Sequence, residues 1–163
     1  MKSQCCLDNF EKEKCCLDGK KNIKEANVFY KSDFILQKGT EKSLGYDICS
    51  NVLVCLEFLK PFVVSTGLFL DMKENINALV CSRSGLATKG VFVLNSPGII
   101  DNDYTGEVKI ILLSINKKKI VIEKGSRIAQ LVFLKQSSII LKKVNIIEKK
   151  TARGSGGFGH TGL

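Results

Sequence analysis

The stretch Asn95–Glu107, NSPGIIDNDYTGE, decides how the middle of this chain folds. It holds a Pro-Gly turn, an apolar pair, the acid Asp101 and the aromatic Tyr104, and apolar strand sequence flanks it at Val91–Leu94 and Val108–Leu113. Because proline has no N–H to donate, the Ser-Pro dipeptide inside the stretch ends a ladder. The sequence therefore predicts a hairpin with one carboxylate and one ring at its rim. On this evidence alone, a solvated turn explains the acid equally well.

The length and composition indicate a globular protein. A chain of 163 residues with 44% apolar content is long enough for one domain with a real core. The longest apolar region, Val52–Leu70, is interrupted by Glu57, Lys60 and Pro61, so it does not match a membrane span. Residues 1–14 contain no apolar run of the length that a secretory signal needs. We expect a cytoplasmic protein with no membrane partner.

The net charge and the cysteines bear on partners and compartment. A charge of +9, from 25 basic and 16 acidic residues, suits either nucleic acid or a small polyanion such as a nucleotide. The lysines are scattered and lack interleaved aromatics for stacking, so no nucleic-acid partner is predicted. Seven cysteines, an odd number with two adjacent pairs, favour a reducing compartment over a disulfide framework. The CC-x8-CC arrangement over residues 5–16 could hold zinc, but no histidine lies near it.

From Val28 onward, short apolar runs alternate with turn residues. Most runs are short and rich in β-branched side chains, the last being Ile139–Ile147, and no stretch keeps a helical period over three turns. This pattern predicts an all-β fold, a sandwich or closed barrel of the jelly-roll-like kind. We divide the chain into a polar N-terminal extension (1–26), a β-barrel domain (27–150) and a flexible Gly-rich C-terminal tail (151–163).

The tail, TARGSGGFGHTGL, combines five glycines with Arg153 and Phe158. Its composition is that of a flexible linker, yet its residues also suit a nucleoside triphosphate. Glycine N–H groups can converge on an anion, and the arginine fork pairs with phosphate oxygens. The phenylalanine face can stack on a base, which contributes about 1–3 kcal/mol. The tail is not a P-loop, because no Gly-Lys-Ser/Thr follows the glycines.

Two further segments place an arginine at the end of a strand. In CSRSGLA, residues 81–87, Arg83 and Ser84 directly follow an apolar run. In GSRIAQL, residues 125–131, Arg127 and Gln130 begin another run. Each segment is a candidate for binding phosphate, with a solvated charge as the alternative.

Five segments, in this order, resemble the motifs of the trimeric deoxyuridine triphosphatase (dUTPase) family. They are Gly45–Ser50, Arg83–Ala87, Gly98–Asp101 continued by Tyr104–Glu107, Gly125–Leu131 and Arg153–Gly159. The resemblance covers residues 28–162, and NSPGIID together with His160 is similar to the bacterial type. It implies a homotrimer of jelly-roll-like β-barrels, in which the C-terminal tail closes over an intersubunit active site.

The resemblance implies hydrolysis of dUTP to dUMP and pyrophosphate, which keeps uracil out of DNA and supplies dUMP for thymidylate synthesis. Asp101 would activate the water that attacks the α-phosphate, and Tyr104 would pack under the deoxyribose and exclude a 2′-hydroxyl. Uracil would be read by Asn95 and by the main chain around Ile99, Ile100 and Lys109.

The remaining substrate contacts are implied in the same way. The α- and β-phosphates would be held by Arg83, Ser84 and Gly85, with Arg127 and Gln130 in the same phosphate or subunit-contact region. The γ-phosphate would be reached by Arg153, Gly157 and Thr161, and Phe158 would stack on uracil. Magnesium is the implied cofactor. It would be held mainly by the triphosphate, with Asp47 touching it only through water.

The chain departs from the family pattern at a few positions. Cys81-Ser82 stands where many members have an Ala-Pro pair, and Leu44 replaces a common small residue. Ser126 stands where an acid usually precedes the arginine, so that ion pair of Arg127 is expected to be missing.

Two alternative functions remain. A dCTP deaminase of the same superfamily shares the barrel, but the Phe-containing glycine tail favours dUTPase. A catalytically silent trimeric nucleotide-binding regulator would keep the fold, but the intact Asp101, Tyr104 and Arg153 argue against it.

Overall fold

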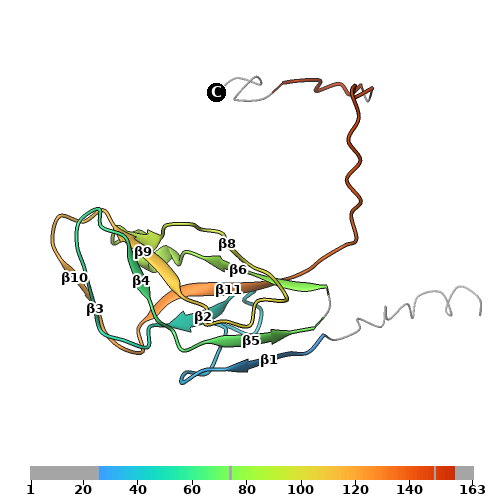
Figure 1. Ribbon diagram of the computed structural model, residues 1–163. Coiled ribbons are helices and arrows are strands. Elements are labelled where there is room, and N and C mark those ends of the chain that lie inside the picture. Colours follow the sequence, from blue (N-terminus) through green and yellow to red (C-terminus); the bar gives the residue numbers. More distant parts are fainter. Residues whose placement is uncertain (1–25, 74, 149, 157–163) are drawn as a thin grey trace, which may run out of the picture.

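The computed structural model describes residues 26–73, 75–148 and 150–156. The regular structure of these residues is almost entirely β, which confirms the all-β, jelly-roll-like prediction (Figure 1). Among the described residues there is one short helix, α2 (Ser84–Ala87). The strands are β1 (Val28–Lys31), β2 (Tyr46–Cys49), β3 (Val54–Leu56), β4 (Phe62–Val64), β5 (Phe69–Met72), β6 (Ile76–Cys81), β7 (Val91–Val93), β8 (Gly98–Ile100), β9 (Ile110–Ser114), β10 (Ile120–Ile122) and β11 (Arg127–Lys135). No helix in the described part of the chain has the length and apolarity to cross a membrane.

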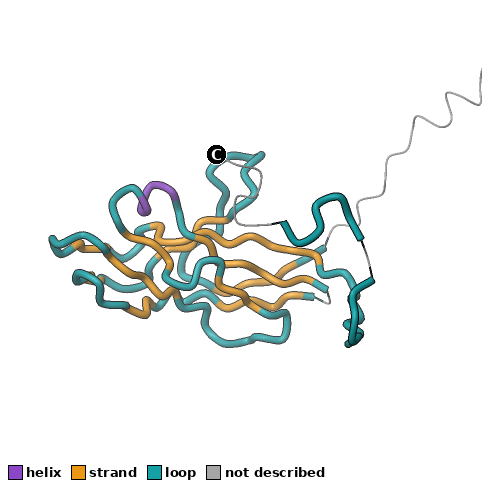
Figure 2. Tube along the Cα trace, turned by 90° about the horizontal axis from the view of Figure 1, so that it is seen from above, coloured by secondary structure: helices purple, strands orange, loops and turns teal. Residues whose placement is uncertain are grey.

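The strands form four antiparallel sheets. The largest has the order β2-β11-β6-β8, and a second has the order β4-β9-β7. Two further pairs, β1-β5 and β10-β3, complete the set. Most neighbours in these sheets are distant in sequence, as in other jelly-roll-like folds. Seen from above, the strands run mostly along one direction and α2 lies in a loop at one end (Figure 2).

The core follows from the alternation of side chains along the strands. In β6 every second residue is buried, namely Ile76, Ala78 and Val80. In β9 the same alternation buries Ile110 and Leu112. Because successive side chains point to opposite faces of a strand, this pattern leaves the other face of β6 free to carry polar groups. Each fully buried Leu, Ile or Val contributes about 1.5–3 kcal/mol, so the core fixes the sheets that carry the site.

The hairpin predicted from Asn95–Glu107 is confirmed, and its interior is more elaborate than expected. The flanking strands β7 and β9 pair, from Val91 opposite Ser114 to Val93 opposite Leu112. Between them the chain leaves this sheet, and β8 pairs with β6 in the other one. The stretch therefore connects two sheets.

The run Ile139–Ile147, predicted as a strand, forms none here. Residues 136–148 leave the body as an extended arm beyond β11 (Figure 1). Its apolar side chains are exposed, Leu141 to 93%. An extended segment becomes a strand only when a neighbour pairs with it, and the described part of the chain supplies no strand to the arm beyond Gln136. The N-terminal extension, apart from Ala26, and the tail residues Gly157, Phe158 and Thr161 lie outside the described residues.

Candidate functional site

The predicted site residues gather in two separate cavities. One, of about 320 Å³, is lined by the Asn95–Glu107 stretch and residues near it, and we call it the hairpin pocket. The other, of about 520 Å³, contains both predicted phosphate arginines, and we call it the arginine pocket. The two cavities share no lining residue.

Five predicted residues line the hairpin pocket: Ile99, Ile100, Asp101, Tyr104 and Lys109. Asp101 directly follows β8, in an exposed turn closed by the amide of Tyr104, which donates to the Asp101 carbonyl at 3.1 Å. Asn95 is not part of the lining. A Cβ on Gly98 would lie 2.9 Å from Asn95 Nδ2, so the glycine is what lets this side chain approach β8.

On both walls of the hairpin pocket there are backbone N–H and C=O groups that are not paired with a neighbouring strand in the described part of the chain. β8 is the edge strand of its sheet, and no strand of the described residues pairs with its side away from β6. On the other wall, Val108 N donates to Leu68 O and Val108 O accepts from Thr66 Oγ1. Because backbone groups alternate in direction along an extended segment, those of Lys109 face the opposite way, toward the cavity. The pocket can therefore pair with a ligand edge that has both donors and acceptors.

Tyr104 is fixed at the rim of the hairpin pocket by a short-range contact. Its hydroxyl donates to the Glu107 carbonyl at 2.9 Å. A Cβ on Gly106 would lie 2.6 Å from that hydroxyl oxygen, so only glycine leaves room for the ring. The ring is thus presented as a rigid apolar surface inside the cavity lining.

Glu107 also lines this pocket, and the sequence analysis gave it no role. Its Oε1 accepts from Ser65 Oγ, from Thr66 N at 3.1 Å and from Gly67 N at 2.9 Å. The hydrogen bond from Ser65, followed by that from the Gly67 amide, lowers the pKa of the carboxyl below its ordinary value. The sequence signal was an acid at the end of the hairpin, and its partners lie about forty positions away, beyond the reach of local patterns.

The arginine pocket brings together three adjacent strands and the start of α2. Asp47 of β2 and Cys81 of β6 both lie opposite Gln130 of β11, so their side chains share one face of the sheet. The predicted residues that line this pocket are Asp47, Arg83, Ser84, Gly85, Arg127 and Gln130.

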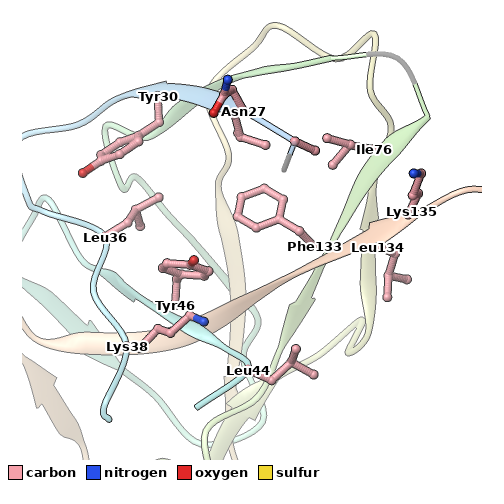
Figure 3. A pocket seen from close by; sticks show the side chains of 12 residues that line it. Asn27, Tyr30, Leu36, Lys38, Leu44, Tyr46, Ile76, Phe133, Leu134 and Lys135 are labelled. Carbon is pink, nitrogen blue, oxygen red and sulfur yellow. The ribbon is translucent and has the colours of Figure 1, made fainter. Parts of the chain in front are cut away.

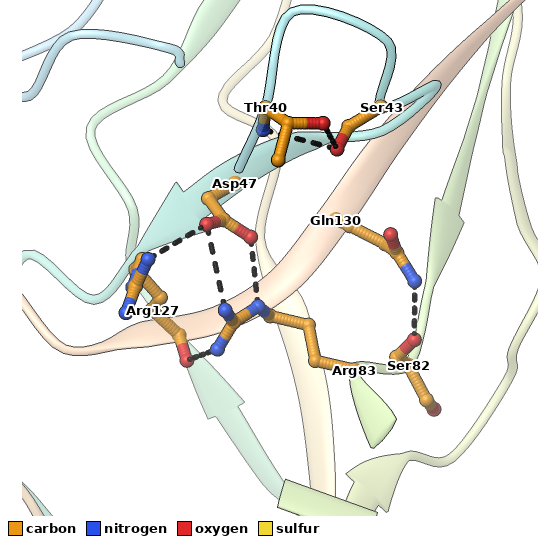
Figure 4. A network of polar contacts seen from close by, with 7 residues as sticks. All are labelled: Thr40, Ser43, Asp47, Ser82, Arg83, Arg127 and Gln130. Atoms are coloured by element: carbon orange, nitrogen blue, oxygen red, sulfur yellow. Dashed lines mark hydrogen bonds and ion pairs between the residues drawn. The ribbon is translucent and has the colours of Figure 1, made fainter. Parts of the chain in front are cut away.

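A carboxylate organises the two arginines (Figure 4). Arg83 Nε donates to Asp47 Oδ1 at 2.7 Å, and Arg127 Nη1 donates to Asp47 Oδ2 at 3.3 Å. Arg83 Nη1 also donates to the Arg127 carbonyl at 3.1 Å. We expected Arg127 to lack its family ion pair because Ser126 replaces an acid, and Asp47 supplies a partner instead.

Gln130 is fixed between two neighbours in the same pocket. Its Nε2 donates to the Ser82 carbonyl at 2.9 Å (Figure 4). A Cβ on Gly45 would lie 2.5 Å from Gln130 Oε1, so the glycine permits this close approach. The predicted replacement at Leu44 does not close the pocket, since that side chain is exposed at its edge.

Arg153 is in neither pocket of its own chain. Its Nε donates to the Gly156 carbonyl at 2.8 Å in an exposed turn. The turn follows the arm that leaves the body, which keeps this arginine apart from both cavities.

A third cavity, of about 580 Å³ and larger than either of these two, lies elsewhere, and most of its lining residues are apolar (Figure 3). Tyr30, Leu36, Tyr46 and Phe133 line it, and the last two rings meet edge to face with centroids 5.8 Å apart. It contains none of the predicted site residues. Size alone would have pointed to the wrong place for the predicted chemistry.

The two predicted half-sites lie at opposite ends of β6. Asn102 N donates to Asn77 Oδ1 at 3.0 Å, so Asp101 lies beside the first residues of β6. Arg83 lies two positions after Cys81, the last residue of the same strand. Asn77 and Arg83 are six positions apart along extended chain, which is about 20 Å. One chain therefore does not bring Asp101 and the arginine pocket together.

The charged groups of these pockets do not form a metal cage. Within the described ranges, no three His, Cys, Asp or Glu side chains are grouped as ligands. Cys49 lies next to the arginine pair. Its burial, with a further contribution from Asp47, raises the pKa of the thiol. A raised pKa keeps that thiol protonated and unreactive.

The sequence of this chain is similar to those of known proteins. The dUTPase family model matches residues 32–162. The deoxyuridine 5′-triphosphate nucleotidohydrolase of Hydrogenobaculum sp. (strain Y04AAS1) is 43% identical over 130 residues, covering 76% of this chain and 87% of that protein. The enzyme of the same name from Rickettsia bellii (strain OSU 85-389) is 50% identical over 127 residues, covering 76% and 84%.

Solved structures give the same result. The Staphylococcus bacteriophage 80alpha dUTPase with dUpNHpp superposes with a TM-score of 0.74 at 26% identity, covering 84% of this chain and 99% of that one. The native EIAV dUTPase superposes with a TM-score of 0.63 at 26% identity, covering 74% and 100%. On the family match and these relatives, this chain belongs to the dUTPase family.

Proposed function

We propose that this protein hydrolyses dUTP to dUMP and pyrophosphate, and so limits uracil in DNA and supplies dUMP for thymidylate synthesis. The observation that carries the proposal is the hairpin pocket, where Asp101, Tyr104 and free backbone edges surround one small cavity. This combination offers a base for a water molecule, a surface for a sugar and hydrogen-bonding groups for a planar base.

In this mechanism Asp101 accepts a proton from the water that attacks the α-phosphorus. A positioned general base of this kind contributes about 10²–10⁴-fold to the rate. Its exposure in the free chain leaves the carboxylate available to bind water before the substrate closes the site. The negative charge that develops on phosphate is stabilised by the arginines rather than by Asp101.

Tyr104 and the backbone select the nucleoside. The ring packs under the deoxyribose, where a 2′-hydroxyl has no room. The free edges at Ile99, Ile100 and Lys109, with Asn95, pair with uracil. A cytosine, whose donors and acceptors are reversed, leaves buried groups unpaired, and such a mismatch costs about 1–3 kcal/mol per group.

Phosphate binds in the arginine pocket. Within the described residues, Arg83 donates to protein groups through all three of its nitrogens, whereas Arg127 does so through one. Arg127 therefore has more of its five N–H donors left for phosphate oxygens. Ser84 and Gly85 add backbone N–H groups at the start of α2, which have no acceptor inside the helix.

Magnesium, held mainly by the triphosphate, would neutralise part of the phosphate charge. Asp47 lines the arginine pocket, but both of its oxygens already accept from guanidinium groups. This donor set suits a contact to a metal-bound water and does not suit direct ligation.

The complete site uses more than one copy of the chain, in a homotrimer. The dUTP α-phosphate is bonded to the sugar beside Asp101, so it does not reach an arginine pocket about 20 Å away along β6. The exposed apolar arm over residues 136–148 also supports assembly, because such side chains are normally covered. By the family resemblance, Arg153, Gly157 and Thr161 of the tail bind the γ-phosphate and Phe158 stacks on uracil. Free thiols at Cys49, Cys55 and Cys81 fit a cytoplasmic location.

The test is a substrate series with magnesium and dUTP, dCTP, dTTP or UTP, in which pyrophosphate and ammonia are followed. We expect pyrophosphate from dUTP, little from the others, and a loss of at least about 10²-fold in kcat for Asp101→Asn with nucleotide binding kept. Ammonia from dCTP would indicate the deaminase, and no turnover of any nucleotide would indicate a silent binding protein.

The shared site has its own test. Asp101→Asn and Arg83→Ala variants are expected to be inactive alone. Mixed and reassembled, they should regain part of the activity, because some sites then combine an intact Asp101 with an intact Arg83. Mixtures that stay inactive while forming mixed oligomers would contradict a site built from two copies.

A further inference from the structure

Glu107, at the end of the hairpin, is hydrogen-bonded to the turn at residues 65–67. A single oxygen of its carboxylate accepts from the Ser65 hydroxyl, the Thr66 amide and the Gly67 amide. The side chain is only 19% exposed. A carboxylate that takes three donors on one oxygen is held in a single orientation, because each bond constrains a different direction.

The turn at residues 65–68 also forms hydrogen bonds with Val108, the next residue of the hairpin. Thr66 Oγ1 donates to the Val108 carbonyl, and Val108 N donates to Leu68 O at 2.8 Å. The returning strand of the hairpin is thus fastened to residues 65–68 by five hydrogen bonds, of which Glu107 receives three. Of the residues joined by these bonds, Glu107 and Val108 line the hairpin pocket.

Tyr104 depends on this fastening for its position. Its hydroxyl donates to the Glu107 backbone carbonyl at 2.9 Å, and an adjacent Gly106 leaves space for the ring. Tyr104 is otherwise part of an exposed turn, so little else restrains its ring. The Tyr104 ring is therefore held in place as long as the Glu107 carbonyl is held in place. If the Glu107 backbone moves, the ring can move with it.

We propose that Glu107 is a positioning residue that sets the discrimination between deoxyribose and ribose by holding Tyr104 in place. The inference rests on the proposed function, in which Tyr104 excludes the 2′-hydroxyl. Glu107 itself touches no reacting atom. Its carboxylate acts through the 65–67 turn and its own carbonyl.

The experiment compares kcat/KM for dUTP and for UTP in the full-length protein and four variants. Glu107→Ala removes the anchor, and Glu107→Gln keeps an oxygen that can accept the three donors. Ser65→Ala removes one donor. Glu57→Ala is the matched control, because it removes an exposed carboxylate that pairs with Lys60 and Lys119 outside both pockets.

For Glu107→Ala we expect kcat/KM for dUTP to fall by about 10²-fold, since a displacement of about 1 Å at a positioning contact has that effect. UTP turnover should fall much less, so that the dUTP/UTP ratio drops at least about tenfold. Inhibition by pyrophosphate, which uses the arginine pocket, should stay within about twofold. Glu107→Gln should recover most of the ratio, and Ser65→Ala should give a smaller drop in the same direction.

Two results would overturn the inference while leaving the proposed function intact. One is a dUTP/UTP ratio in Glu107→Ala equal to that of Glu57→Ala. The other is an equal loss of dUTP turnover, UTP turnover and pyrophosphate inhibition, which is the mark of general damage to the fold. If Glu107→Ala does not fold, an unchanged ratio in Ser65→Ala also counts against the inference. A wild-type protein that fails to hydrolyse dUTP would instead refute the proposed function.

Discussion

Replacing Asp47 by alanine should destabilise the protein even when no nucleotide and no magnesium are present. The carboxylate joins Arg83 and Arg127 in the arginine pocket, and its removal leaves two guanidinium groups facing one another. The effect separates two roles of Asp47. Contact with metal-bound water matters only with substrate, whereas the arginine pairing matters in the free protein.

The size of the effect follows from the exposure of the three side chains. Asp47 is 12% exposed and Arg83 25%, so their short hydrogen bond is largely shielded and contributes about 1.5–3 kcal/mol. Arg127 is 56% exposed, and a pair of this kind contributes about 0–1 kcal/mol. We therefore expect a loss of roughly 2–3 kcal/mol. For a chain of this length that corresponds to about 5–10 °C in Tm.

The assay is thermal unfolding in buffer without magnesium or nucleotide. Asp71→Ala is the matched control, because it removes an ion pair to Lys73 in which both side chains are exposed. The control should change Tm by less than about 2 °C. An Asp47→Ala protein that unfolds at the same temperature as the control would refute the pairing argument and would leave Asp47 with a role only at the metal.

Two further predictions concern the hairpin pocket. The Ser65 hydrogen bond lowers the pKa of Glu107, so the contribution of this carboxylate to stability is present above about pH 4.3 and is lost as the pH falls through the lower folded-state pKa. The stability of Glu107→Gln should therefore fall less steeply than that of the wild type in this pH range. Identical pH–stability curves for Glu107→Gln and the wild type would contradict the assignment. Gly106→Ala should displace the ring of Tyr104, since the new Cβ would lie 2.6 Å from its hydroxyl. Because the ring is exposed, we expect Tm to change by less than about 3 °C while kcat/KM for dUTP falls about tenfold or more. An unchanged kcat/KM would show that the position of the ring does not matter.

Much of the fold could be predicted because short β-branched runs report strands directly. The apolar runs that form β6 and β9, and the pairing of the strands that flank the hairpin, follow from local patterns. The arm over 136–148 could not be predicted, because a run such as Ile139–Ile147 looks the same whether or not a partner strand exists. Whether a segment forms a strand depends on a partner strand beside it as well as on its own sequence.

The grouping of the candidate site residues in pockets was predictable to a similar extent. Asp101, Tyr104, Arg83 and Arg127 stand in segments that resemble family motifs, and each lines a pocket. The pairing of Asp47 with Arg127 was not predictable, because it joins residues eighty positions apart through the register of β2 and β11. A sequence compared position by position shows that an acid before Arg127 is missing, but not that another strand supplies one.

The division of the site between two ends of β6 has a consequence for turnover. Ion pairs at Asp47 and hydrogen bonds at Glu107 order each half without a ligand, so binding need not order either half. In the proposed mechanism, one dUTP molecule spans the hairpin pocket of one copy and the arginine pocket of another, and it gains from being held at both. Hydrolysis between the α- and β-phosphates cuts that link. Afterwards dUMP keeps the nucleoside contacts and pyrophosphate keeps phosphate contacts, so each product binds more weakly than the substrate did, and the chemical step itself promotes release.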